Sequence, residues 1–214
     1  HGYVDLNEAM AQSVNTYFFE LAVDLGIERF SSYMERFGFG QPTGIDLLGE
    51  GSGVLPSPHW KRMARNQAWF PGETVIAGIG QGFWVVTPLQ LAQATSMLAN
   101  GGVMRRPHLL RATQSGFDAP KVEVSYPESN VAVVDNPQHL TAVAESMVQV
   151  LHGPTGTART VLAEFDLDYL VAGKTGTAQR ITRKTDDSLD VNALPFAQRH
   201  NALFIAFAPV EDPK

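Results

Sequence analysis

The stretch VAGKTGTAQR, residues 171–180, determines how the rest of the chain is interpreted. Its apolar start belongs to a run over 169–174 that the pattern predicts to be a buried strand, which is expected to end at Lys174. Two threonines around a glycine follow the lysine. An ammonium, two hydroxyls and a backbone without a β-carbon can together bind an anionic ligand along the strand, and a carboxylate suits this set. The alternative is an ordinary turn with a solvated lysine.

The composition is that of a globular protein with one good-sized domain. The chain has 214 residues, of which 44% are hydrophobic. Its 16 basic and 22 acidic residues give a formal charge of −6, without a run rich in Lys or Arg, so nucleic acid is not expected as a partner. The chain has no cysteine, and its six histidines show no metal-ligand spacing. We therefore expect no metal and no other cofactor.

Four segments carry apolar residues at helical spacing. Asn15 or Thr16 can cap the first, which Gly26 ends. Thr87 is the expected cap of the clearest helix, with Pro88 at its first position. The four helices are expected over 16–26, 28–37, 87–102 and 137–151.

The remaining segments are extended or irregular. Glycine and proline are dense over 38–58, which predicts a long connection with at most one short strand. Two buried strands are expected at 169–174 and 202–208, and no helix lies between them, as antiparallel neighbours allow. The polar segment 182–199 that joins them is expected to be mobile. The fold class is therefore α+β, with an antiparallel sheet flanked by helices. Further extended segments are expected at 103–112 and 121–126.

Two glycine-rich motifs could suggest a nucleotide site. The stretch GIGQG at 78–82 lacks the third glycine spacing and the βαβ context of a dinucleotide loop, so a tight turn is favoured. The stretch GPTGTAR at 153–159 lacks the GK[ST] ending of a phosphate-binding loop. Trp60, Trp69 and Trp84 are expected to pack in the core or to line a groove, with the core favoured.

A second motif gives the lysine a partner. The triplet K-T-G occurs together with S-x-x-K and S-D-N in penicillin-binding proteins and class A β-lactamases. Ser13-Val14-Asn15 is an S-x-N, and it precedes Lys174 as the order of those motifs requires. Taken alone, this S-x-N would be an ordinary helix cap.

Longer blocks extend the match. The segments SVNTYFFELAVDLG, RFGFGQPTGIDLLGE, PGETVIAGIGQG, TPLQLAQATSMLANGG, RPHL, GTAR and VAGKTGTAQ follow one another in order. This set strongly resembles the transpeptidase domain of class B penicillin-binding proteins, and PGET with GIGQGFW resembles the elongation-type penicillin-binding protein 2 group. The resemblance covers about 2–211. It implies the penicillin-binding protein and serine β-lactamase-like fold, incomplete at its N-terminus, with 1–214 as the C-terminal part of one transpeptidase domain.

The resemblance implies a peptidoglycan D,D-transpeptidase that cross-links stem peptides during cell elongation and that β-lactams acylate. By position, Ser13 is the hydroxyl of a proton shuttle, and Asn15 holds the amide of the acyl donor and orients the catalytic lysine. Lys174 supplies positive charge near Ser13 and near the substrate carboxylate.

The substrate-binding positions follow the lysine. The hydroxyls of Thr175 and Thr177 are expected to bind the carboxylate of the substrate, and the backbone N–H of Thr177 to form half of an oxyanion hole. Gly176 keeps the strand open to the ligand.

One motif of the family is absent. No serine among the 214 residues has a lysine three positions later, and the nearest case, Ser57 with Lys61, is one residue too long and follows Ser13. We expect that the chain starts after the S-x-x-K segment, that the intact protein is an enzyme and that this chain alone is inactive. The other hypotheses are a non-catalytic β-lactam sensor or scaffold, a β-lactamase-type hydrolase and a pure binding module.

Partners and location follow from the same resemblance. It implies peptidoglycan stem peptides, β-lactam antibiotics and a membrane glycosyltransferase of the elongation machinery as partners. It also implies the periplasmic side of a bacterial inner membrane, with an anchor outside this chain. The longest apolar run, LFIAFAPV at 203–210, is far shorter than the ~20 residues of a membrane helix.

Overall fold

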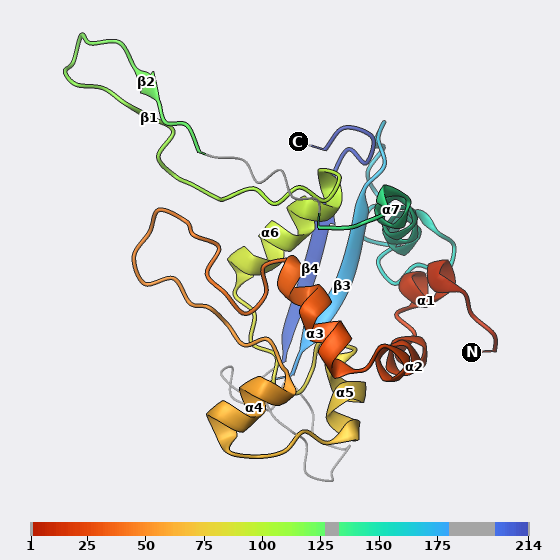
Figure 1. Cartoon of the computed structure of the whole chain (residues 1–214). Helices are drawn as coiled ribbons and strands as arrows, with labels where there is room; N and C mark the ends of the chain where they lie inside the picture. Colours follow the sequence, from red (N-terminus) through yellow and green to blue (C-terminus); the bar gives the residue numbers. More distant parts are fainter. Residues whose placement is uncertain (1, 127–132, 180–199, 214) are drawn as a thin grey trace.

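The structure is a computed structural model that describes residues 2–126, 133–179 and 200–213. Seven helices and four strands are found in these ranges (Figure 1). The helices are α1 (Leu6–Gln12), α2 (Asn15–Leu25), α3 (Ile27–Arg36), α4 (Pro58–Arg65), α5 (Pro71–Ala77), α6 (Pro88–Ala99) and α7 (Pro137–His152). The strands are β1 (Ala112–Thr113), β2 (Val122–Glu123), β3 (Ala172–Ala178) and β4 (Asn201–Phe207).

The two long strands form an antiparallel pair, as predicted. Their register runs from Ala172 opposite Phe207 to Ala178 opposite Asn201. The predicted end of the first strand at Lys174 is wrong, because β3 continues to Ala178. The threonines after the lysine are β-branched and pair with β4, so the K-T-G-T sequence lies inside the strand and not in a turn.

Helices cover this sheet and bring the S-x-N motif close to the K-T-G motif. Helix α7 packs against β3, α6 packs against β4, and α1 packs against α7 (Figure 1). The contact of α7 with β3 is apolar, with Met147, Val148 and Ala172 buried in one cluster. Because α1 rests on α7, the turn after α1 is held beside β3.

Local signals fix the clearest helix. The Thr87 side chain accepts a hydrogen bond from the Gln90 N–H, and the Gln90 side chain accepts one from the Thr87 N–H, which together form a capping box. The prediction for α2 is wrong at its start, because neither Asn15 nor Thr16 is the cap. Val14 occupies that position and makes no side-chain cap bond, since the chain turns directly from α1 into α2.

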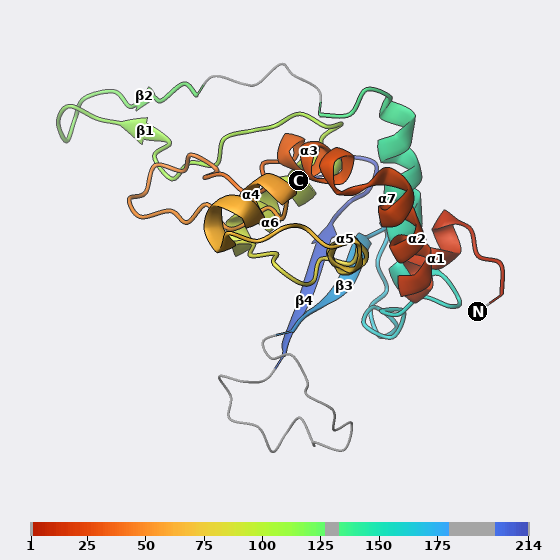
Figure 2. The ribbon, with the colours of Figure 1, turned by 60° about the horizontal axis from the view of Figure 1, so that its bottom comes forward.

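The segments between the helices are mostly irregular. The connection over 38–58 contains no strand, only an isolated bridge from Val54 to Val85. Of the segments predicted as extended at 103–112 and 121–126, the parts in the strands β1 and β2 pair with each other and form a hairpin that projects from the body (Figure 2). The segment 182–199 lies outside the described residues. No helix in the described ranges is long and apolar enough to cross a membrane.

Helices α4 and α5 are joined by a buried ion pair. Lys61 in α4 is 1% exposed, and its Nζ bonds to Oε1 of Glu73 in α5. The other Glu73 oxygen accepts the Phe70 N–H at 2.8 Å, and the Lys61 ammonium lies 4.5 Å from the centre of the Phe70 ring. One carboxylate thus closes the start of α5 and neutralises the lysine of α4.

Candidate active site

Ser13 lies at the tight turn between α1 and α2. Its backbone is left-handed, with φ 54° and ψ 51°, and it caps the C-terminus of α1. A non-glycine residue in this conformation costs about 1 kcal/mol, so the surrounding structure must hold it. Val14, which is 4% exposed, anchors the turn in the core. The S-x-N motif is therefore held by its middle residue, and Ser13 is directed to β3.

Lys174 meets Ser13 from the sheet. Its Nζ donates a hydrogen bond to Ser13 Oγ and a second, at 3.0 Å, to the carbonyl oxygen of Thr175. Partial burial lowers the pKa of Lys174. The structure therefore brings two motifs 161 residues apart into direct contact and places a partly desolvated ammonium on a hydroxyl.

Thr175 and Thr177 present their backbone to the edge of β3 that does not face β4. The carbonyl of Thr175 accepts a hydrogen bond from Lys174 Nζ and that of Thr177 accepts one from Gln81 Nε2, and neither donor belongs to β4. Alternate residues of an antiparallel strand share this direction, so both threonines turn their N–H and C=O groups the same way. Gly176 and Thr177 are exposed there. Within the described ranges β3 pairs with β4 alone, so this edge is open to a ligand.

Thr157 is a site residue for which the sequence analysis gave no role. It belongs to the GTAR block, and its Oγ1 lies 3.2 Å from Oγ1 of Thr175. Its N–H donates to the Ala11 carbonyl at 3.0 Å, so the end of α1 fixes it. A third hydroxyl thus lies beside the two threonines for which a carboxylate-binding role is predicted. Its only sequence signal was the place of GTAR among the matched blocks.

Asn15 lies near this group without joining it. It is exposed in the first turn of α2, two residues after Ser13. Within the described ranges no hydrogen bond links Asn15 to Lys174. Its role toward an acyl donor and a second lysine stays a prediction.

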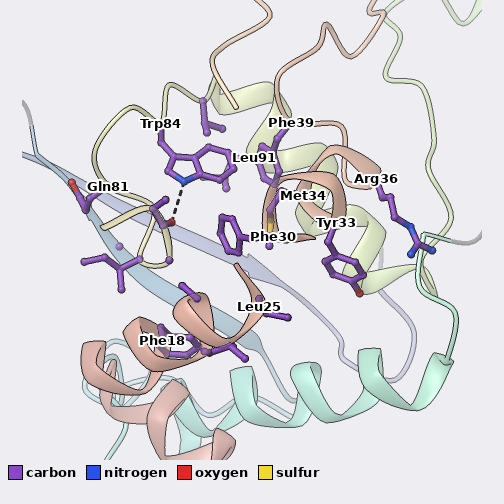
Figure 3. A pocket seen from close by; sticks show the side chains of 18 of the residues that line it. Phe18, Leu25, Phe30, Tyr33, Met34, Arg36, Phe39, Gln81, Trp84 and Leu91 are labelled. Atoms are coloured by element: carbon purple, nitrogen blue, oxygen red, sulfur yellow. Dashed lines mark hydrogen bonds between the residues drawn. The ribbon is translucent and has the colours of Figure 1, made fainter. Parts of the chain in front are cut away.

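A large cavity adjoins the open edge of β3. Its volume is about 1030 Å³, and its walls come from α2, α3, α5, α6 and the segment after α5 (Figure 3). Most of the lining is apolar, including the aromatic rings of Phe18, Phe30, Phe39 and Trp84. Trp84 Nε1 donates to the Ala77 carbonyl at 3.1 Å, so this tryptophan lines a groove. The other two tryptophans pack on Phe83.

Residues 1–214 match the family model of the penicillin binding protein transpeptidase domain. The chain belongs to this family. The match agrees with the contact between the S-x-N and K-T-G motifs and with the antiparallel sheet flanked by helices.

Several of the relatives are MrdA or penicillin-binding protein 2 proteins. The peptidoglycan D,D-transpeptidase MrdA of Haemophilus influenzae is 38% identical over 215 residues, which cover 100% of this chain and 32% of the relative. The crystal structure of Pseudomonas aeruginosa PBP2 in complex with WCK 5153 has a TM-score of 0.81 and 42% identity, over 100% of this chain and 43% of that one. Helicobacter pylori PBP2 in its complex with MreC has a TM-score of 0.77 and 30% identity, over 100% and 35%.

These similarities confirm the predicted family, its penicillin-binding protein 2 type and its fold. The chain spans about a third of the length of the curated relative, at 32%. The similarity therefore covers only part of the whole protein, whose activity, substrates and partners are a matter of proposal.

Proposed function

We propose that the intact protein is a serine-type peptidoglycan D,D-transpeptidase that cross-links stem peptides during cell elongation. The hydrogen bond from Lys174 Nζ to Ser13 Oγ carries this proposal. It joins an ammonium to a hydroxyl at the open edge of β3. This suits a proton relay beside a strand that binds an anion. The similarity to the MrdA proteins supports the same activity.

In the proposed reaction a serine hydroxyl attacks the penultimate D-alanine carbonyl of a stem peptide. The carbonyl oxygen becomes an oxyanion that the Thr177 N–H stabilises. The bond to the terminal D-alanine then breaks, and Ser13 relays the proton from the nucleophile's neighbourhood to the leaving amine. An amine of a neighbouring strand attacks the resulting ester, forms the cross-link and restores the serine.

The carboxylate of the acyl donor binds beside this relay. The hydroxyls of Thr175, Thr177 and Thr157 donate hydrogen bonds to it, and Lys174 supplies the counter-charge. Asn15 holds the donor amide. These roles cover the predicted residues Ser13, Asn15, Lys174, Thr175 and Thr177, and Thr157 is added to them.

The nucleophile is proposed to come from an S-x-x-K segment of the whole protein, since no serine of these 214 residues has the required lysine. The cavity beside β3 is a suitable place for the helix that carries it. Its lining is apolar, and it reaches the K-T-G-T strand at Gly176 and Thr177. An apolar helix face buried there would also cover the aromatic side chains that line the cavity.

Labelled penicillin tests this function. The full-length protein should form a stable 1:1 covalent adduct and release D-alanine from a stem peptide, because it contains both the nucleophile and the residues proposed to bind the carboxylate. The 214-residue chain, as the matched control, should form no adduct. A stoichiometric adduct on that chain would contradict the assignment of the nucleophile, and failure of the full-length protein to react would contradict the function.

The same assay separates the alternatives. A non-catalytic sensor or scaffold, which would lack the serine, and a pure binding module would form no adduct and release no D-alanine. A hydrolase would turn penicillin over rapidly, whereas a transpeptidase keeps a long-lived acyl-enzyme.

The pH dependence of acylation should reflect Lys174. Burial lowers its pKa, so the folded protein loses this ammonium at a lower pH than the unfolded chain does. Between the two pKa values the unfolded chain binds more protons, so the free energy of unfolding rises with pH in that window. If acylation needs the ammonium, its rate should fall as the pH rises. This fall should begin at a lower pH than the one at which an exposed lysine deprotonates. An alkaline decline at or above the ordinary lysine pKa in the measured rate profile would contradict this.

For the whole protein we propose stem peptides, β-lactams and a membrane glycosyltransferase of the elongation machinery as partners. We place it on the periplasmic side of a bacterial inner membrane. The complex of Helicobacter pylori PBP2 with MreC supports assembly into a larger complex.

A further inference from the structure

The GIGQG turn presents one polar side chain on a fixed loop. Gly80 and Gly82, on either side of Gln81, have φ angles of 72° and 79°, which favour glycine. The Gly80 N–H donates to the Ala77 carbonyl at 3.0 Å, and the Gln81 N–H donates to the Ile76 carbonyl at 3.2 Å. The turn is thus tied to the end of α5, and the only freedom left to Gln81 is in its side chain.

Gln81 reaches the K-T-G-T strand. Its Nε2 donates a hydrogen bond of 2.6 Å to the carbonyl oxygen of Thr177, 96 residues away. This oxygen points to the edge of β3 that is open within the described ranges. Figure 3 shows Gln81 beside the strand at the rim of the cavity. A tethered amide therefore occupies the acceptor that a ligand on this edge would use.

An extended peptide that adds to a strand edge donates its amide N–H groups to the free carbonyls of that edge. An acyl donor lying along β3 would offer such an N–H to Thr177. Both the donor and Gln81 then compete for one oxygen. The turn holds the Gln81 amide beside this oxygen, so the displaced amide stays close by and can return.

We propose that Gln81 is a specificity-determining residue, whose amide must be displaced from the Thr177 carbonyl by the amide N–H of an acyl donor. This inference rests on the proposed transpeptidase function. It predicts that Gln81 slows acylation by compounds with an amide N–H at that position and does not slow compounds without one.

The test compares two β-lactams on the full-length protein. One is a penicillin with an acylamido side chain, and the other is a carbapenem with a hydroxyethyl group, which has no amide N–H. Gln81→Met keeps the length of the side chain and removes the donor, and Gln81→Asn keeps the amide but shortens the reach. Both variants should raise the ratio of penicillin to carbapenem acylation rates about three- to tenfold, the range of one net hydrogen bond.

A matched control comes from the projecting hairpin. Gln114 is an exposed glutamine whose Nε2 likewise donates to backbone carbonyls, those of Phe117 at 2.8 Å and Ala119 at 2.6 Å. Gln114→Met should leave the ratio unchanged. A loss of structure in the Gln81 variants would slow both compounds equally and leave the ratio constant, which overturns the proposal, as does a lower ratio. Wild-type protein that reacts with neither compound overturns the transpeptidase function itself, and the role of Gln81 with it.

Discussion

Replacing Lys174 with methionine in the full-length protein should slow acylation by penicillin by about a hundredfold to ten thousandfold. The ammonium contacts Ser13 Oγ and lies on the strand whose threonine hydroxyls are proposed to bind the carboxylate. The variant therefore loses both the proton relay and the counter-charge for the carboxylate. Methionine has nearly the same shape, which keeps the packing of β3. The measurement is the second-order rate constant of adduct formation with a labelled penicillin.

Two controls separate this effect from a loss of stability. Lys121, an exposed lysine next to β2, offers the matched change Lys121→Met, which should leave the rate constant unaltered. Burial already disfavours the charged form of Lys174 and lowers its pKa, so Lys174→Met should unfold at no lower temperature than the wild type. A variant that keeps its unfolding temperature and reacts at the wild-type rate would show that Lys174 takes no part in the reaction.

The structure explains why the Ser13 and Lys174 pair was accessible from the sequence. Each motif has a recognisable spacing, and the resemblance to the penicillin-binding proteins implied that the two lie at one site, so their contact was predicted. The helix at Thr87 was predictable for a different reason: its cap and its Pro88 are local signals within one turn.

Features that depend on distant contacts were not accessible. The β-branched threonines after Lys174 favour a longer strand, but its end at Ala178 is set by pairing with β4. Helices α4 and α5 are only 8 and 7 residues long, too short for a periodic pattern, and their prolines at 58 and 71 resemble breaks. The GIGQG turn was identified as a turn, but the partner of Gln81 lies 96 residues away.

The buried ion pair between α4 and α5 should give the largest stability effect. Glu73→Gln keeps the shape of the side chain and an oxygen that can accept the Phe70 N–H. It removes the only carboxylate within ion-pair distance of Lys61 among the described residues. Because Lys61 is 1% exposed, its charge would be left in the interior, at a cost of about 3 kcal/mol in the free energy of unfolding. Denaturant unfolding of the transpeptidase domain within the full-length protein measures this loss.

A double variant tests whether the charge is the cause. In Lys61→Met with Glu73→Gln no buried ammonium remains. Most of the lost stability should return, because the end of the Lys61 side chain lies near the Phe70 and Phe83 rings and an apolar methionine can pack there. The exposed pair of Arg111 and Glu123, at 3.7 Å, supplies the control Glu123→Gln, which should leave the free energy of unfolding almost unchanged. If the double variant is as unstable as Glu73→Gln alone, the unpaired ammonium of Lys61 is not the cause of the lost stability. In that case the role of Glu73 as the counter-charge of Lys61 is excluded as the main source of stability.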